Sequence, residues 1–277
     1  MNAHWSPDGQ SIAFSADNHQ GIWLADADGS NIRQLTADQG AGFGFSWSPC
    51  GHFILGRAAT FRLWRRFNQV KIYDVQNMEY DVLVKDTRAL RSLPLWTPGG
   101  SQVAMVLGDR LELKSSERLR SVESDPDAET GHIVYFLEGT LISTDMDTKT
   151  SREIASFDGR TVFNISMSPC GRKVAFQVGG RGLFVAATDG SEVKHLGYGE
   201  RASWMPDGKY VVAALVKDDG YTITGSDLYM VNTGTGVYSP LTEHTGLVAM
   251  NPSVSPCGKK VLFNNPDDGN IYVMALE

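Results

Sequence analysis

A short turn motif that recurs six times along the 277-residue sequence most constrains the fold of this chain. Each copy has Pro in its second position and Gly in its fourth, and a short strand-forming run follows it. The copies occupy residues 6–9, 48–51, 97–100, 168–171, 205–208 and 255–258. Because Pro presets φ and Gly adopts the positive φ that reverses the chain, each copy predicts a tight hairpin between two strands.

Two further strands, with a polar turn between them, follow several of these hairpins, as in residues 21–36 and 70–84. The repeat unit is therefore four antiparallel strands, termed a, b, c and d, with the Pro-x-Gly turn between a and b. Repetition of such a unit is typical of the blades of a β-propeller. The predicted fold class is all-β, a propeller of four-stranded antiparallel blades.

The spacing of the turns predicts the number of blades. The step from residue 97 to residue 168 is too long for one blade, and within it residues 119–123, 125–127 and 131–136 fit a degenerate strand a, turn and strand b. With that copy included, the 249 residues from position 6 to position 255 make six steps of about 41.5 residues, near the usual blade length. The sequence favours seven blades over six, in a single domain over residues 1–277, with a thin third blade.

Three segments of the first blade, residues 6–14, 21–24 and 28–36, resemble the TolB-type propeller repeat. The resemblance extends over nearly the whole chain. It implies the fold, but propellers of this type are periplasmic interaction scaffolds, gating domains of serine peptidases and polysaccharide lyases. Function therefore has to be argued from individual residues.

The charge balance restricts the partners. A net charge of −7 provides no bulk attraction to nucleic acid or to an anionic membrane, both of which need clustered Lys and Arg. No run of about 18 apolar residues occurs, and the first residues show no secretory signal. We expect a soluble chain in a reducing compartment, hence cytoplasmic, or periplasmic if a leader has been removed.

Cys50, Cys170 and Cys257 each occupy the third position of a Pro-x-Gly turn. Turns of different blades lie too far apart for disulfide geometry, so we expect three unpaired turn residues. The acidic turns at 26–29, 145–147 and 267–269 lack the continuing ligand pattern of a calcium loop and are interpreted as structural turns. No metal or other cofactor is predicted.

Blade two contains an unusual connection between strands b and c, from residue 56 to residue 69, which is rich in arginine and aromatic residues in an acidic protein. The candidate binding residues in it are Arg57, Phe61, Arg62, Trp64, Arg65 and Arg66. Two interpretations remain open. The segment is either a long hairpin with Phe61, Leu63 and Phe67 packed inwards, or an exposed aromatic and arginine patch of the kind enriched at binding hot spots.

The connections between strand d and the next strand a leave the blades on the same side as that segment. They contribute a second set of candidate binding residues, Arg88, Arg91, Arg160, Arg201 and His244. Residues just before strand a surround the mouth of a propeller's channel, where several arginines could bind a carboxylate or phosphate. The alternative is isolated surface arginines on separate loops.

No catalytic motif is present: the six histidines form no His-x-His pair, and no Gly-x-Ser-x-Gly elbow occurs. The predicted function is a non-catalytic interaction module that binds a protein partner, an acidic small ligand or an oligosaccharide through the b–c and d–a loops. The alternative is an oligogalacturonate-type polysaccharide lyase or another carbohydrate-active propeller. We expect a monomer, unless another chain completes the last blade, which lacks a strand d.

Overall fold

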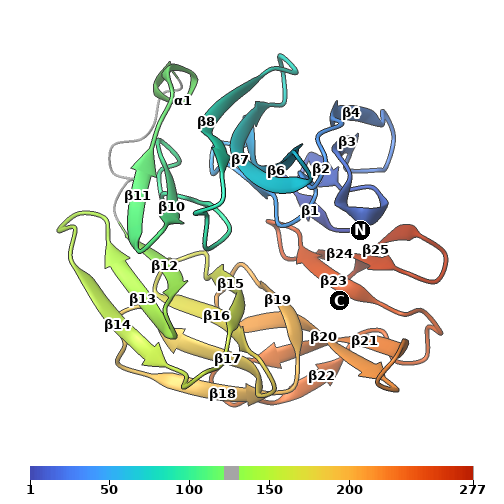
Figure 1. Cartoon of the computed structure of the whole chain (residues 1–277). Coiled ribbons are helices and arrows are strands. Elements are labelled where there is room, and N and C mark those ends of the chain that lie inside the picture. The colour runs from blue at the N-terminus through green and yellow to red at the C-terminus, as the bar shows by residue number, and fades with distance from the viewer. Residues whose placement is uncertain (122–130, 277) are drawn as a thin grey trace. The chain divides into compact units, whose positions relative to one another are not determined.

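The computed structural model describes residues 1–121 and 131–276, and these residues are organised as seven small antiparallel sheets (Figure 1). Each sheet has the strand order of one blade, so the predicted seven-bladed β-propeller fold is confirmed. The chain divides into two compact units, Met1–Ile133 with Asp145–Thr150, and Val134–Thr144 with Ser151–Glu277. A single domain over the whole chain stays a prediction.

The first three blades belong to the first unit. Blade one consists of β1 (Ala3–Trp5), β2 (Ser11–Phe14), β3 (Ile22–Asp26) and β4 (Arg33–Thr36), with the 3-10 turn η1 (Asp17–His19) between β2 and β3. Blade two consists of β5 (Ser46–Trp47), β6 (Phe53–Arg62), β7 (Arg65–Asp74) and β8 (Tyr80–Thr87). Blade three has three strands, β9 (Leu95–Trp96), β10 (Val103–Leu107) and β11 (Arg110–Lys114), which confirms that it is thin.

The remaining blades lie mainly in the second unit. Blade four consists of β12 (His132–Leu137), β13 (Thr140–Asp145) and β14 (Ser151–Ser156). Blade five consists of β15 (Val162–Met167), β16 (Lys173–Val178), β17 (Gly182–Ala187) and β18 (Val193–Gly197). Blade six consists of β19 (Glu200–Trp204), β20 (Tyr210–Asp218), β21 (Ile223–Asn232) and β22 (Tyr238–Pro240). Blade seven consists of β23 (Met250–Val254), β24 (Lys260–Asn265) and β25 (Asn270–Ala275), without a strand d among the described residues.

One predicted strand is wrong. Residues 119–121, expected to begin strand a of blade four, lie in the helix α1 (Glu117–Ser121), whereas the rest of that strand and its turn at 125–127 lie outside the described residues. Leu119 is buried among side chains of blades two and three, and Arg118 forms ion pairs with Asp74, Glu79 and Asp81. These contacts favour a helical turn against blade two. No helix in the described ranges has the length and apolarity needed to cross a membrane.

The core lies between consecutive blades, because strand b of a blade is buried on both faces. In β16, Val174 and Phe176 belong to the cluster shared with blade four, whereas Ala175 belongs to the cluster shared with blade six. Successive side chains of a strand point to opposite faces, so a continuous apolar run serves two neighbours at once. Each blade of a unit is therefore held by burial against the next.

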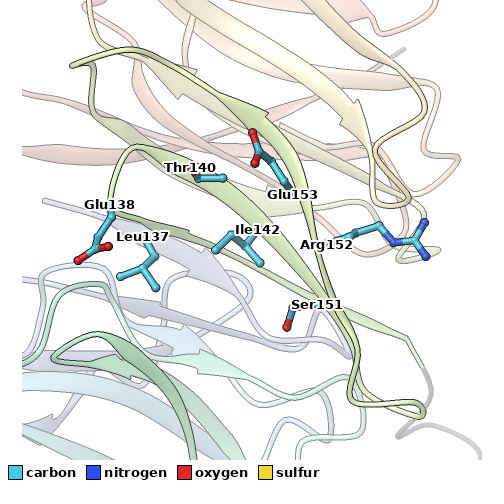
Figure 2. Close-up of a pocket in the computed structure, with 7 residues that line it drawn as sticks. All are labelled: Leu137, Glu138, Thr140, Ile142, Ser151, Arg152 and Glu153. Carbon is cyan, nitrogen blue, oxygen red and sulfur yellow. The ribbon is translucent and has the colours of Figure 1, made fainter.

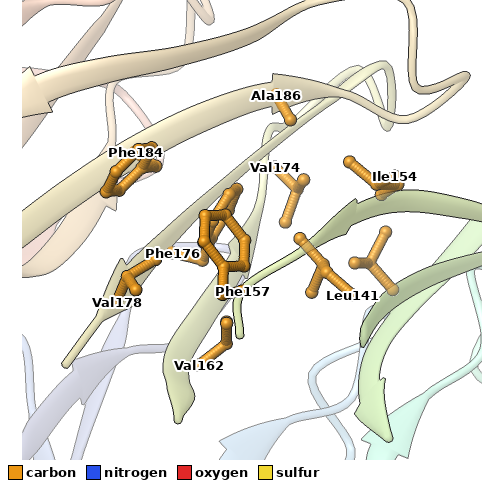
Figure 3. Packing of buried hydrophobic residues seen from close by; sticks show 10 residues of the cluster. Leu141, Ile154, Phe157, Val162, Val174, Phe176, Val178, Phe184 and Ala186 are labelled. Carbon is orange, nitrogen blue, oxygen red and sulfur yellow. The ribbon is translucent and has the colours of Figure 1, made fainter. Parts of the chain in front are cut away.

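Aromatic side chains fill the cluster between blades four and five (Figure 3). Phe176 and Phe184 stack with ring centroids 5.7 Å apart, and Phe157 meets both of them edge-on. Leu141 of β13 packs against this group from blade four. Offset and edge-to-face contacts of this kind stabilise beyond the area that they bury.

The Pro-x-Gly turns use a hydroxyl group that the sequence analysis did not assign. In five of the six, the first residue accepts a hydrogen bond through its side-chain oxygen from the backbone N–H five residues later. Those residues are Ser6, Ser48, Thr97, Ser168 and Ser255. The three cysteines are unpaired and exposed, and each Sγ lies 3.2 to 3.5 Å from the hydroxyl of its turn, as expected for turn residues.

Tryptophans at the end of strand a connect neighbouring blades. The indole Nε1 of each donates a hydrogen bond to a backbone oxygen in strand a of the preceding blade. The pairs are Trp47 to His4 at 3.2 Å, Trp96 to Ser46 at 3.3 Å and Trp204 to Ser166 at 2.9 Å. A Trp directly before the Pro-x-Gly turn was therefore a visible signal of blade-to-blade contact.

The turn hydroxyl yields a stability prediction. Replacing buried Ser168 with Ala leaves the backbone N–H of Lys173 without its side-chain acceptor at 3.0 Å, so unfolding should become easier by about 1 kcal/mol. Urea denaturation measures this. Ser191→Ala removes an exposed turn hydroxyl in the same blade and should change the unfolding free energy little. Equal effects of the two variants would contradict the role assigned to Ser168.

Candidate functional site

The connection singled out in blade two is a long hairpin. Strands β6 and β7 pair in register from Phe53 opposite Asp74 to Arg62 opposite Arg65, and a two-residue turn joins them. Because β5 has only two residues, the outer half of the hairpin extends beyond the strand on one side of it. The segment is therefore a hairpin, as one interpretation held, but its end does not pack inwards.

Apolar side chains are exposed at the hairpin tip, formed by residues 61–66. Trp64 is 100% exposed, Leu63 is 93% exposed and Phe61 is 57% exposed. Inward packing of Phe61 and Leu63 is therefore wrong, while Phe67 is half-buried. Both turn residues have positive φ, 46° for Leu63 and 64° for Trp64, the arrangement of a type I′ turn. Such turns favour Asn and Gly, so bulky residues are held there in a costly conformation.

One face of the hairpin is fastened by Asp86, near the end of β8, binds side chains on one face of the hairpin. Its Oδ1 accepts hydrogen bonds of 2.9 Å from both Thr60 and Gln69, and Arg62 forms an ion pair with its other oxygen. The hydrogen bonds from Gln69 and Thr60, with the charge of Arg62, lower the pKa of Asp86. This network joins both strands of the hairpin to β8 and uses Arg62 as a structural cation.

Arg57 and Arg66 lie on the opposite face of the hairpin from Asp86. The Arg57 guanidinium carbon is 5.1 Å from the centroid of the Phe43 ring, within cation–π range. Burial first, and the positive charge of Arg66 second, lower the pKa of Arg57. The structure thus brings two of the predicted arginines together, whereas Arg65 remains exposed at the start of β7.

The loop that carries Phe43 is anchored to blade two by a buried ion pair. Lys71 Nζ, on a side chain only 7% exposed, lies 2.7 Å from Asp38 Oδ2, and the Tyr73 hydroxyl donates to the same oxygen at 2.8 Å. Burial raises the pKa of Asp38, but the hydrogen bonds from Lys71 and Tyr73 outweigh this and hold it below its ordinary value. Lys71 also lies 4.1 Å from the centroid of the Tyr80 ring.

Sequence reasoning missed this loop, although a signal was present. Residues 40–44 contain three glycines, and Gly42 has no room for a side chain, because a Cβ there would lie 2.4 Å from Cβ of Ser15. Closely spaced glycines often mark such an approach of backbone to neighbouring atoms. Phe43 follows directly and reaches the face of the hairpin.

The second predicted set does not come together. Arg88 and Arg91 are exposed on the segment between β8 and β9 in the first unit. In the second unit, Arg160 donates to the backbone oxygen of Gly179 at 2.8 Å, and His244 is exposed between β22 and β23. Within the described residues no hydrogen bond or ion pair joins Arg160, Arg201 and His244. Channel-mouth binding by the whole set stays a prediction.

Arg201 was placed just before strand a, but it lies inside β19, at an irregularity in the pairing with β20. Its φ is 51°, and its backbone N–H donates to Oε1 of the buried Gln177 at 3.1 Å. Asn164 of β15 donates to the same Gln177 oxygen. Burial lowers the pKa of Arg201 more than neighbouring Glu200 raises it. Bulges of strand a therefore place this half-buried cation.

A hollow of about 390 Å³ lies on blade four, lined by residues of β12–β14 and their turn (Figure 2). It contains none of the predicted site residues. Arg152 is directed away from the other lining side chains and donates to the backbone oxygen of Asp189 at 3.2 Å. No group of three His, Cys, Asp or Glu side chains in residues 1–121 and 131–276 is arranged to hold a metal ion.

The fold is shared with solved propellers of different activities. No family model and no curated protein sequence matches this chain. Among solved structures, the propeller domain of Cps50 (Swd1) from Myceliophthora thermophila superposes with a TM-score of 0.64 at 16% identity, over 100% of this chain and 96% of that one. An oligogalacturonate lyase from Vibrio parahaemolyticus gives 0.62 at 14% identity, over 98% and 87%.

TolB from Acinetobacter baumannii has a TM-score of 0.59 at 15% identity, over 99% of this chain. The chain spans 60% of the length of that protein. These similarities support a propeller fold, and they include proteins with and without catalytic activity. They do not distinguish a TolB-type repeat from other propeller repeats.

The strained turn yields a prediction. Replacing Leu63 and Trp64 with Asn and Gly should raise the unfolding free energy by about 1 kcal/mol, because these residues adopt positive φ at lower cost. Thermal and urea denaturation would measure it. The same pair of residues introduced at 32 and 33, where Ile32 is exposed on a different turn, provides a control with equal loss of side chains. A less stable hairpin variant would show that the tip contributes packing.

The Asp38 ion pair predicts a pH dependence. Because the folded pKa of Asp38 lies below its ordinary value of 3.8, its contribution is complete above that value and is lost as the pH falls through the folded pKa. Asp38→Asn should destabilise the protein by about 3 kcal/mol at pH 7, since Lys71 keeps a buried charge. The difference from the unmodified protein should shrink below about pH 4 in urea denaturation. Asp109→Asn, at an exposed turn, serves as control.

Proposed function

We propose that this propeller is a non-catalytic interaction module that binds a protein partner through the hairpin tip. The observation that carries the proposal is the exposure of Trp64 and Leu63 at the end of a ten-residue hairpin. Trp and Arg are the residues most enriched at binding hot spots, and the tip combines Trp64 with Arg65 and Arg66. Exposing two large apolar side chains in water offers the free protein no stabilisation that would explain their presence.

Preorganisation supports the same role. The network around Asp86 holds both hairpin strands against β8, so the tip is presented on an ordered support. An ordered binding element loses less conformational entropy when the partner binds. The strained turn points in the same direction, because bulky residues at positive φ cluster where function requires them.

The finer features of this proposal rest on weaker support. We infer that the blades are of the TolB type from the recurring Pro-x-Gly turns, and that the chain acts as a monomeric scaffold unless the free edge of β25 is paired. The partner is a protein or an acidic ligand, because the net charge of −7 disfavours nucleic acid and membranes. Three exposed, unpaired cysteines support a cytoplasmic location, where thiols persist.

A cross-linking experiment tests the binding role of the tip. A photoreactive phenylalanine analogue at position 64 of the intact chain should cross-link one defined partner in cells that naturally express the protein. The same analogue at exposed Ile32, on the turn between β3 and β4, is the control and should not capture that partner. Identical products from both positions would contradict a binding role for the hairpin tip.

The partner identified in this way permits a quantitative prediction. Trp64→Ala with Arg65→Ala should weaken binding of the purified partner by about 100-fold, since each hot-spot residue contributes about 2 kcal/mol. The midpoint of thermal unfolding should stay within about 1 °C, because both side chains are exposed. Calorimetry and thermal denaturation measure the two quantities. Unchanged affinity, or a simultaneous loss of stability, would argue against the proposal.

A further inference from the structure

The face of the hairpin opposite Asp86 carries positive charge that the described chain leaves uncompensated. The Nε of Arg57 is buried and has no hydrogen-bond partner, and no carboxylate is within ion-pair distance of Arg57 or Arg66 in residues 1–121 and 131–276. On the same face, Oδ1 of Asn68 is also buried without a partner. A buried polar atom left unpaired is costly and rare in folded proteins.

The strand register places these groups together. Arg57 pairs with Val70, Ala59 with Asn68, and Phe61 with Arg66, and residues opposite each other in an antiparallel pair share a face. The Arg66 guanidinium reaches Gly40, where its Nη2 lies 3.5 Å from the position that a Cβ would occupy. Gly40 accepts a backbone hydrogen bond from Phe43, whose ring lies beneath Arg57. Both arginines therefore lie over one short loop.

The nearby carboxylates are already in use. Asp86 is on the other face and is held by Thr60, Gln69 and Arg62. Asp38 accepts from Lys71 and Tyr73. In a chain with a net charge of −7, two neighbouring arginines without an acid of their own are a departure from the average surface. Like charges at this separation repel each other, and an external anion would reverse that cost.

We propose that Arg57 and Arg66, with Phe43 beneath them, form a receptor for a carboxylate group of an acidic peptide. The planar guanidinium groups match a carboxylate through forked, charge-assisted hydrogen bonds. The edge of His19 against Phe43, with ring centroids 5.1 Å apart, adds an aromatic wall. Phe61 shares the face and leads to Leu63 and Trp64, so a segment with an acidic residue next to an apolar one fits both parts.

This inference rests on the proposed function, because it gives the chemistry of the segment that the hairpin binds. It is tested with two synthetic probes, acetyl-Phe-Glu-Glu-amide and acetyl-Phe-Gln-Gln-amide, titrated into the full chain by calorimetry at low ionic strength. The acidic probe should bind about tenfold or more tightly than its amide counterpart, as expected for a hydrogen bond to a charged group. Equal binding of the two probes would overturn the proposal.

The arginine variants locate the effect. Arg57→Gln and Arg66→Gln should each remove most of the preference for the acidic probe, and Arg57→Lys should keep only part of it, because the charge remains while the fork is lost. Arg110→Gln removes the same charge from an exposed side chain of β11 and should leave the preference unchanged. A preference that survives in the double variant of Arg57 and Arg66 would overturn the assignment.

Two further measurements separate this inference from other outcomes. Without probe, Arg57→Gln should melt at the same or a higher temperature than the unmodified protein, since an unpaired buried donor is lost; a lower melting temperature with lost binding would mean that Arg57 is structural. Inorganic phosphate that binds more tightly than the acidic probe would overturn carboxylate selectivity. Trp64→Ala should weaken both probes equally, so the ratio reports the arginines alone, whether or not the natural partner binds the tip.

Discussion

Burial of strand b between two neighbouring sheets is the constraint on which the blades of each unit depend. A single four-stranded sheet exposes two apolar faces, and it becomes stable only when both are covered. In β16 the side chains of Val174 and Phe176 contact blade four, while the intervening Ala175 contacts blade six. The period of two along the strand thus connects three consecutive blades. The indole hydrogen bonds of strand a add a polar contact at the same boundaries.

The candidate site depends on that packing and on one buried ion pair. Asp38 leaves blade one and meets Lys71 and Tyr73 of blade two, where the low exposure of Lys71 strengthens the charge interaction. The pair sets the position of the following loop, and the loop presents Phe43 to Arg57. A surface feature of blade two is therefore completed by a residue of blade one. The packing of blades and the chemistry of the hairpin belong to the same physical problem.

The two faces of the hairpin divide structure from binding. Towards β8, Arg62 is neutralised by Asp86 and contributes to order. On the other face, Arg57 and Arg66 are left without a counter-ion in the described chain, and at the turn Leu63 and Trp64 have bulky side chains at positive φ. Natural proteins retain such local costs mainly where a partner or ligand repays them. Three arginines of similar sequence context thus have different roles.

The amino-acid sequence alone determined the blade. Pro and Gly at fixed positions encode a local turn, and alternation over four to six residues encodes a strand buried on both faces, so seven repeats could be counted without coordinates. It failed where local preference was overridden, as at residues 119–121, whose helix is held by the burial of Leu119 and the ion pairs of Arg118. Tertiary structure alone decided which arginines meet. Arg57, Arg62 and Arg66 are equivalent in composition, but strand register sends them to opposite faces, and the neighbours there, Asp86 or Phe43, come from residues distant in the chain.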